Sequence, residues 1–328
     1  MRRWKDAMTE ALYAPGAGFF TGLGAGPAAH FRTSAHAGPV FARAIARLVA
    51  DVDTALGHPE RFDVVDVGAG RGELLRELAT ALPEPLLQRV RLIGVEVAER
   101  PTDLSQMIRW QRELPEHAMG VLLATEWLDN VPLDVVVRDG AVWRYALVDK
   151  HGNESLGDAV DAGDDEWLRA WWPDGDRAEV GRTRDAAWAH AVGRLSTGLA
   201  LAVDYGHTRA ARPPYGTLTS FVRGRQASPV PDGSRDLTAH VAADAVATAG
   251  SAVAGQEPLL VRQADALAAL GLSGRRPPIE AARADPAGYL RALADASTAA
   301  ELIAPDGLGA HFWLLQPVGI GVPPTMTG

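Results

Sequence analysis

The 328-residue chain contains no cysteine and only two lysines, Lys5 and Lys150. The absence of cysteine excludes disulfide bonds, cysteine-ligated zinc or iron–sulfur sites, and a thiol nucleophile. Lysine and arginine together number 32 against 41 aspartates and glutamates, which gives a formal net charge of −9. A chain this acidic is a poor match for the phosphate backbone of nucleic acid or for an anionic membrane surface.

Long hydrophobic runs are also missing. No stretch approaches the roughly 20 uninterrupted apolar residues that a membrane-spanning helix needs. The basic start Met1–Lys5 is not followed by the apolar segment of a secretion signal. We therefore expect no membrane span and a cytoplasmic location. At roughly 150 residues per domain, the length suits one large domain or two smaller ones.

Short apolar runs alternate with segments of helical spacing along most of the chain. The first run, Phe62–Val67, is typical of a strand buried on both faces, and leucines recur at helical spacing after it. Further candidate strands are Val90–Val97, Met107–Trp110, Val121–Thr125, Leu199–Asp204 and His311–Pro317. Candidate helices lie at 36–56, 237–249, 261–271 and 286–300. This alternation predicts an α/β fold with a doubly wound, mainly parallel sheet.

The alternation is interrupted between residues 134 and 197. Residues 134–150 are typical of a hairpin that turns at Asp139-Gly140. Residues 151–164 are polar and predict a loop, and residues 165–197 predict mostly helix. The expected division is an N-terminal helical cap at 1–60, a core formed by 61–133 and 198–328, and an inserted hairpin and helical subdomain at 134–197.

A glycine-rich segment follows the first candidate strand. Asp66, Gly68, Gly70 and Gly72 form the pattern D-x-G-x-G-x-G before a predicted helix. Glycines allow a sharp turn and let a ligand lie directly on the backbone. A dinucleotide fingerprint would require a third glycine at position 73, where Glu73 stands instead, and its carboxylate would repel a phosphate.

The loop therefore suits a nucleoside that carries a cationic amino-acid end and no phosphate, and S-adenosyl-L-methionine is the obvious candidate. Glu96 ends the second strand, where an acid can accept hydrogen bonds from both ribose hydroxyls of a nucleoside. The alternatives are a tight turn without a ligand and a solvated carboxylate at a strand end.

Several further segments resemble the MidA-type S-adenosyl-L-methionine-dependent methyltransferases, the family of a mitochondrial complex I assembly factor that methylates arginine. The resemblance covers roughly residues 7–317. Its segments are residues 11–20, the loop at 66–72, Thr125–Pro132, Asp204-Tyr205-Gly206, Gly216-Thr217-Leu218 and Asp236–Val241. The chain departs from the family pattern at Thr125, Asn130, His30 and Gly224, where the family usually has Asn, Ala, Asp and His.

The resemblance implies a class I, Rossmann-like methyltransferase fold whose sheet is mostly parallel with an antiparallel last strand. It implies S-adenosyl-L-methionine as the cofactor and an arginine of a partner protein, such as a complex I subunit, as the methyl acceptor. The cofactor-binding residues that it indicates are Asp66, Gly68, Ala69, Gly70, Gly72, Glu96, Thr125 and Glu126. The substrate-binding residues that it indicates are Asp204, Tyr205, Asp236 and Thr238.

Glu126, Asp129 and His240 are the candidate catalytic residues. The two acids are three residues apart just past a parallel strand, so they can face one site and bind a planar guanidinium. His240 can accept a proton near neutral pH. Structural alternatives are a solvated Glu126, a turn capped by Asp129, a hydrogen-bonded structural His240, and Asp236 as the cap of the expected helix at 237–249.

Two other functions stay open at this point. One is a small-molecule O- or N-methyltransferase, and the other is a non-catalytic assembly protein that keeps the fold. The histidines His30, His36 and His240 lack the spacing of metal ligands, so we expect no metal.

Overall fold

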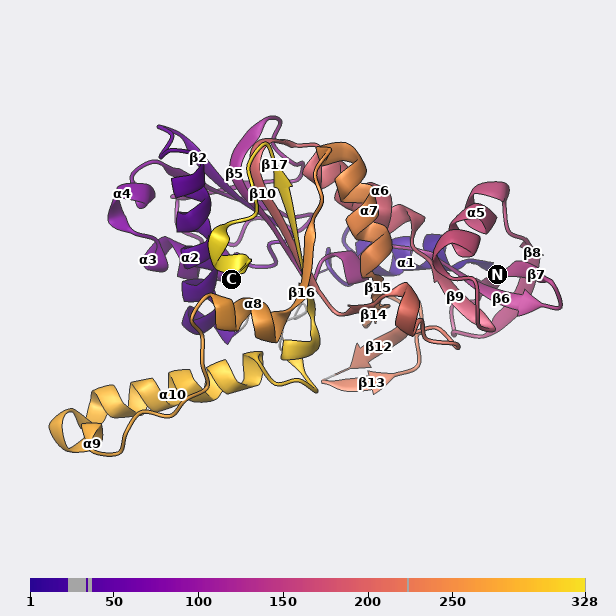
Figure 1. Ribbon diagram of the computed structural model, residues 1–328. Helices are drawn as coiled ribbons and strands as arrows, with labels where there is room; N and C mark the ends of the chain where they lie inside the picture. The colour runs from indigo at the N-terminus through magenta and orange to yellow at the C-terminus, as the bar shows by residue number, and fades with distance from the viewer. Residues whose placement is uncertain (23–33, 35–36, 223, 328) are drawn as a thin grey trace.

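The computed structural model of the chain describes residues 1–22, 34, 37–222 and 224–327. Its central sheet has seven strands in the order β4–β3–β2–β5–β10–β17–β16 (Figure 1). In that order the strands are Ile108–Gln111, Val90–Val95, Phe62–Val67, Ala118–Thr125, Leu195–Asp204, Phe312–Val318 and Leu259–Arg262. Strands β4 to β10 pair in parallel, and β17 runs antiparallel to both of its neighbours. The predicted α/β fold with an antiparallel last strand is confirmed.

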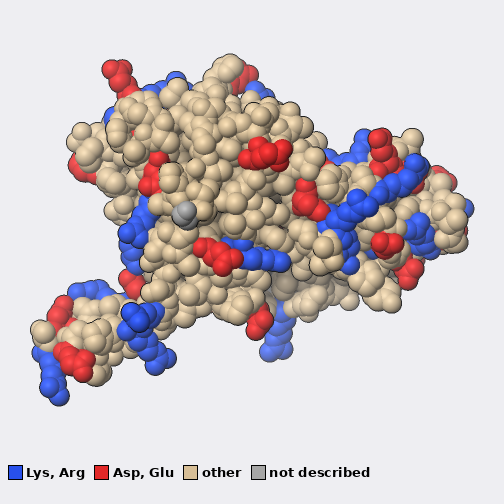
Figure 2. Space-filling view, viewed as in Figure 1, with Lys and Arg blue, Asp and Glu red and all other residues tan. Residues whose placement is uncertain are grey.

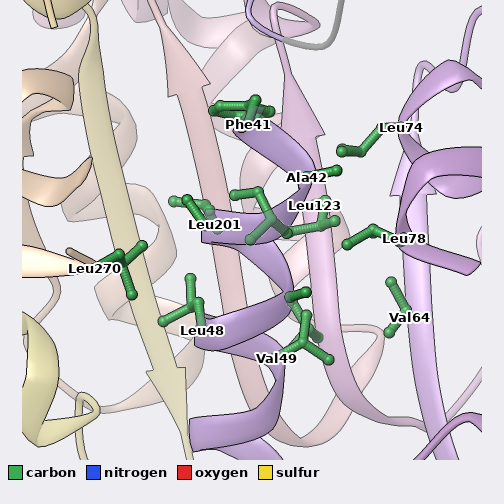
Figure 3. Packing of buried hydrophobic residues seen from close by; sticks show 14 of the residues in the cluster. Phe41, Ala42, Leu48, Val49, Val64, Leu74, Leu78, Leu123, Leu201 and Leu270 are labelled. Carbon is green, nitrogen blue, oxygen red and sulfur yellow. The ribbon is translucent and has the colours of Figure 1, made fainter. Parts of the chain in front are cut away.

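Helices cover both faces of this sheet, which is why its strands are apolar on both sides. One face packs on α2 (Pro39–Ala55), α3 (Glu73–Ala81) and α8 (Gln263–Ala269), and the other on α6 (Arg182–Val192) and α7 (Ala243–Ala254). Side chains alternate between the faces, so Val64 joins the first cluster and Val65 the second. In Figure 3, Phe41, Leu48 and Val49 of α2 lie in the first cluster.

A second sheet lies to one side of the first (Figure 1). Its order is β1–β7–β6–β9, with β8 added on β7. These strands are Arg2–Arg3, Val142–Val148, Asp134–Asp139, Arg177–Val180 and Glu154–Ala159, and they pack on α1 (Trp4–Tyr13) and α5 (Ala162–Trp171). The predicted hairpin is confirmed, since Asp139 pairs with Val142 across the turn. The first 60 residues contribute to both sheets. Strand β1 pairs with the second sheet and α1 packs on it, whereas α2 covers the first.

Two sequence-based predictions are wrong. Residues 151–164, expected to form a loop, contain β8 and the start of α5. Residues 165–197 are mostly helical, as expected, although β9 lies between α5 and α6. β8 is mostly exposed, so its pairing to β7 was not visible as an apolar pattern. The helix expected at 237–249 begins only at Ala243, because Asp236–Thr238 forms strand β14 against β12. Asp236 is therefore not a helix cap.

The remaining elements are short or peripheral. They are α4 (Glu84–Leu87), β11 (Gly206–His207), β12 (Thr219–Val222), β13 (Arg225–Ala227), β15 (Val241–Ala242), α9 (Ala281–Ala284), α10 (Pro286–Leu302) and the 3-10 turns η3 (Leu128–Asn130), η4 (Arg209–Ala211), η5 (Leu308–Ala310) and η6 (Pro324–Met326). Helices α9 and α10 form an arm that projects from the body (Figure 1).

Acidic and basic side chains are interspersed over the face shown in Figure 2. This face has no single large area of positive charge. A protein needs such an area to bind the nucleic-acid backbone strongly. Within the described part of the chain, none of the helices is both long enough and apolar enough to cross a bilayer.

Leu48 tests the packing of α2 on the sheet. The side chain is fully buried in the first cluster, so Leu48→Ala should lower the free energy of unfolding by about 2–5 kcal/mol. Leu290→Ala, on the arm, is the matched control, because Leu290 is 65% exposed and should change stability by less than about 0.5 kcal/mol. Urea unfolding measures both, and equal losses would contradict this packing.

Candidate functional site

The candidate site lies where the carboxyl ends of the parallel strands meet. Gly68 follows β2, Glu96 follows β3 and Glu126 follows β5, and Asp204 is the last residue of β10. The registers place these ends side by side, with Val67 opposite both Val95 and Ala124, and Val203 opposite Thr125. This edge is where ligands bind in open α/β sheets.

The glycine loop needs its glycines for conformational reasons. Gly68, Gly70 and Gly72 have φ values of 70°, 58° and 81°, in the left-handed region that other residues rarely adopt. A Cβ at Gly68 would also lie 2.9 Å from Cδ1 of Trp127. Gly72 precedes the first residue of α3, so the loop leads directly into the free N–H groups of that helix.

Glu96 holds the glycine loop in place. Its Oε2 accepts a hydrogen bond from the Gly70 N–H at 2.9 Å, and its Oε1 accepts from the N–H groups of Val97 at 2.7 Å and Ala98 at 3.1 Å. Burial raises the pKa of Glu96 despite these donors. Asp66 is buried beneath the loop, and burial together with the charges of Glu73 and Glu96 raises its pKa to about 8.

Glu126 is held in an unusual backbone conformation at the end of β5. Its φ is 51°, and its N–H donates to the Val203 carbonyl at 2.7 Å. Its Oε1 accepts from the Ser34 N–H at 2.7 Å. Burial, and then the charge of Asp129, raises the pKa of Glu126 to about 8. The carboxyl is therefore largely protonated at neutral pH.

Asp129 binds two of the residues expected to contact substrate. Its Oδ2 accepts hydrogen bonds from the Tyr205 hydroxyl and from Oγ1 of Thr238, the latter at 2.7 Å. Its Oδ1 is buried without a hydrogen-bond partner among the described residues. Burial raises the pKa of this carboxyl, although both hydroxyl donors oppose the shift.

Two further acids border Asp129. Asp204 Oδ2 accepts from the N–H groups of Leu128 at 3.0 Å and Asp129 at 3.2 Å, and Asp236 Oδ1 accepts from the Asn130 side chain at 2.8 Å. Burial and the neighbouring Asp129 charge raise the pKa of both carboxyls. The second oxygen of each is buried and has no partner within the described ranges.

Arg184 of α6 places one positive charge among these acids. Only 1% of the residue is exposed. Its guanidinium donates to the carbonyls of Asp129, Val131 at 3.2 Å, Ala239 at 2.8 Å and His240 at 3.0 Å. Each guanidinium nitrogen thus donates to a backbone carbonyl, so the cation reduces the repulsion between the acids without pairing directly with a carboxylate oxygen.

Two histidines lie at the same edge. His240 is exposed, its ring centre lies 5.2 Å from that of Tyr205, and its backbone N–H donates to Thr217 Oγ1 at 2.9 Å. Partial desolvation of the imidazole, followed by the charge of Arg184, lowers the pKa of His240. His311 precedes β17 and lies 5.6 Å from the Tyr205 ring, and burial lowers its pKa to about 4.

The structure brings the candidate cofactor-binding, substrate-binding and catalytic residues to one edge of the sheet. The segments from 66–72, 96, 125–129, 204–205 and 236–240 adjoin one another there. Sequence reasoning missed Arg184, His311 and Ser34, whose partners are distant in the sequence. His30 and His36 lie outside the described residues. Gly224 has a φ of 76° in the turn between β12 and β13, so the turn itself favours glycine there.

In the described part of the chain, no group of three acidic or histidine side chains is arranged to hold a metal ion.

Comparison with known proteins gives two results. A family model described as "Putative S-adenosyl-L-methionine-dependent methyltransferase" matches residues 44–261. The chain also resembles the crystal structure of a "COG1565 superfamily member and likely methyl transferase" from Burkholderia thailandensis bound to S-adenosyl-homocysteine, with 27% identity, a TM-score of 0.79, and coverage of 97% of this chain and 88% of that chain.

A native crystal structure of a COG1565 superfamily protein from the same organism gives the same TM-score of 0.79 and 27% identity, and covers 98% of this chain and 89% of that one. A search of curated proteins gave no match.

The raised pKa of Glu126 predicts a pH-dependent stability. The folded protein holds this carboxyl at a pKa of about 8, whereas an unfolded glutamate titrates near about 4.3, so the folded state binds the extra proton between these values. The wild-type free energy of unfolding should therefore fall as pH rises from about 5 to 8, by at most about 1.4 kcal/mol per pH unit for this group. Glu126→Gln should flatten the slope in urea unfolding.

Glu99→Gln is the control for this measurement, because Glu99 is exposed. A slope in Glu126→Gln as steep as that of the wild type and of Glu99→Gln would show that Glu126 does not carry the effect.

Proposed function

We propose that this chain, which belongs to the family of S-adenosyl-L-methionine-dependent methyltransferases whose model spans residues 44–261, methylates an arginine side chain of a partner protein. The family membership gives the reaction type and the cofactor. The identity of the methyl acceptor is inferred from the site itself. The observation that supports arginine is the group of buried acids around Asp129.

The cofactor would lie on the glycine loop. Gly68 and Gly70 are exposed on the loop, and Glu96, which follows β3, reaches the loop through its hydrogen bond from the Gly70 N–H. The Glu96 carboxylate is a hydrogen-bond acceptor, which suits ribose hydroxyls, and Asp66, Ala69 and Thr125 complete the expected set. When bound, S-adenosyl-L-methionine supplies an electrophilic methyl group on a cationic sulfonium.

The acids beside the loop favour a cationic acceptor. Asp129 and Asp204 interact with the guanidinium of Arg184, and Glu126 and Asp236 interact with Asp129. Three buried oxygens of the aspartates lack partners among the described residues. A guanidinium brings one positive charge and a planar set of N–H donors, so it would satisfy the charge and the hydrogen bonds together. The MidA-type segments described above give independent support for arginine.

The chain's own groups would then have distinct roles. Asp204 and Asp236 would hold the incoming guanidinium, and Asp129 would orient it with help from Tyr205 and Thr238. Glu126 directly precedes Trp127, whose ring lies beside Gly68 of the cofactor loop, and it would face the acceptor nitrogen. His240, at the exposed end of the cluster, would pass a proton to solvent.

Gly70→Val tests the cofactor position. The added side chain would occupy the ligand's path, so we expect at least about 100-fold weaker binding of S-adenosyl-L-methionine by calorimetry. Gly140→Val is the control, because Gly140 has a similar φ, 62° against 58°, and lies in open space at the hairpin turn. Both variants carry the same backbone strain, so weakened binding by both would argue against this placement.

Label transfer tests the acceptor. Protein incubated with a cell extract and methyl-labelled S-adenosyl-L-methionine should label a protein band, and mass spectrometry should place the label on arginine. Glu126→Gln should keep cofactor binding but reduce transfer at least about 100-fold, in the range lost with other groups that act in the transition state. Label in the small-molecule fraction would instead indicate an O- or N-methyltransferase of metabolites. Cofactor binding without any transfer would indicate an assembly protein.

A further inference from the structure

His311 reaches the site from a strand that runs opposite to the others. Because β17 is antiparallel to β10, its first residues lie at the carboxyl ends of the parallel strands, with Phe312 opposite Asp204. The backbone of His311 is fixed on both sides: its N–H donates to Leu308 at 3.1 Å, and its carbonyl accepts from the Gln263 N–H at 2.8 Å. The residue is only 8% exposed.

The imidazole of His311 has a buried nitrogen without a partner. Nδ1 makes no hydrogen bond within the described ranges, and it lies 3.9 Å from Oε1 of Glu126. The side chains are 11% and 6% exposed, so little water can separate them. An unpaired buried nitrogen is costly, and packing against the Tyr205 ring needs only an aromatic or aliphatic side chain. The imidazole therefore requires another explanation.

We infer that Glu126 and His311 share one proton, and that His311 holds it when a cationic ligand lies beside Glu126. The proton leaves the carboxyl oxygen of Glu126 and binds Nδ1 of His311, so an O–H bond breaks, an N–H bond forms, and the charge of the pair stays the same. Glu126 is then a carboxylate that can accept the proton lost by the acceptor nitrogen. His311 acts through Glu126 and is a positioning residue; the inference rests on the proposed function.

The surroundings favour this exchange. Without a ligand the proton belongs to Glu126, because burial raises the pKa of its carboxyl to about 8 and lowers the pKa of His311 to about 4. A nearby cation stabilises the carboxylate, and the carboxylate in turn stabilises an imidazolium. The other ionisable groups that act on the pair are Asp129, Asp204, Asp236, Tyr205 and His240. His240 opposes a positive charge on His311, so the negative charge left on Glu126 is what stabilises the imidazolium.

Proton counting by calorimetry tests the inference. S-adenosyl-L-methionine is titrated at pH 7 into the full chain in phosphate and in Tris, whose ionisation enthalpies differ, so the difference in heat gives the number of protons released. We expect close to zero for the wild type and for the exposed control His151→Asn. We expect close to one for His311→Asn, because the amide cannot hold the proton and Glu126 must release it to solvent. Glu126→Gln in the His311→Asn background should return the count to zero.

Equal proton counts for the wild type and His311→Asn would overturn the inference. Absence of binding heat in folded wild-type protein would overturn the proposed function as well, so the two failures are distinguishable. A second measurement needs no folded variant at this site: the imidazole nitrogens of the ¹⁵N-labelled wild type should show one histidine that becomes protonated on addition of S-adenosyl-L-methionine at pH 7. Spectra in which no imidazole gains a proton on addition of the cofactor would contradict the exchange.

Discussion

The burial of several carboxyl groups around one guanidinium is the constraint on which the site depends. Asp129, Asp204 and Asp236 are all buried at the carboxyl edge of the main sheet, and Arg184 is the cation that the described residues place among them. Buried charges are costly unless they are paired or neutralised. The protein meets this cost partly by backbone donors and partly by a raised pKa of these carboxyls, which a positive charge beside them would lower again.

The second sheet is part of this arrangement. Arg184 comes from α6, which follows the last strand of that sheet, and its donors bind carbonyls in two segments of the site. Glu179 of β9 accepts hydrogen bonds from the N–H groups of Thr217 at 2.6 Å and Leu218 at 3.0 Å, and Thr217 in turn accepts from the His240 N–H. The inserted region thus sets the position of residues at the candidate site and supplies a counter-charge for its acids.

The sequence was informative where function depends on local pattern. The strand before Gly68, the three glycines and the acid at the end of the next strand all follow from short-range spacing, and the structure places them at one edge. Arg184 and His311 were missed because their partners lie far away in the chain. The sequence predicts a helix where β14 lies because Asp236 resembles a cap before alanine-rich sequence, whereas pairing with β12 determines the conformation of this segment.

The most direct test of the account is the titration of the Glu126 carboxyl carbon by ¹³C NMR, with the signal assigned by its loss in Glu126→Gln. In the free protein this carbon should titrate near pH 8, and S-adenosyl-L-methionine should move its midpoint to lower pH. A midpoint close to that of an ordinary glutamate, unchanged by the cofactor, would contradict the account, because it would show that neither burial nor the neighbouring acids disfavour the charged form of Glu126.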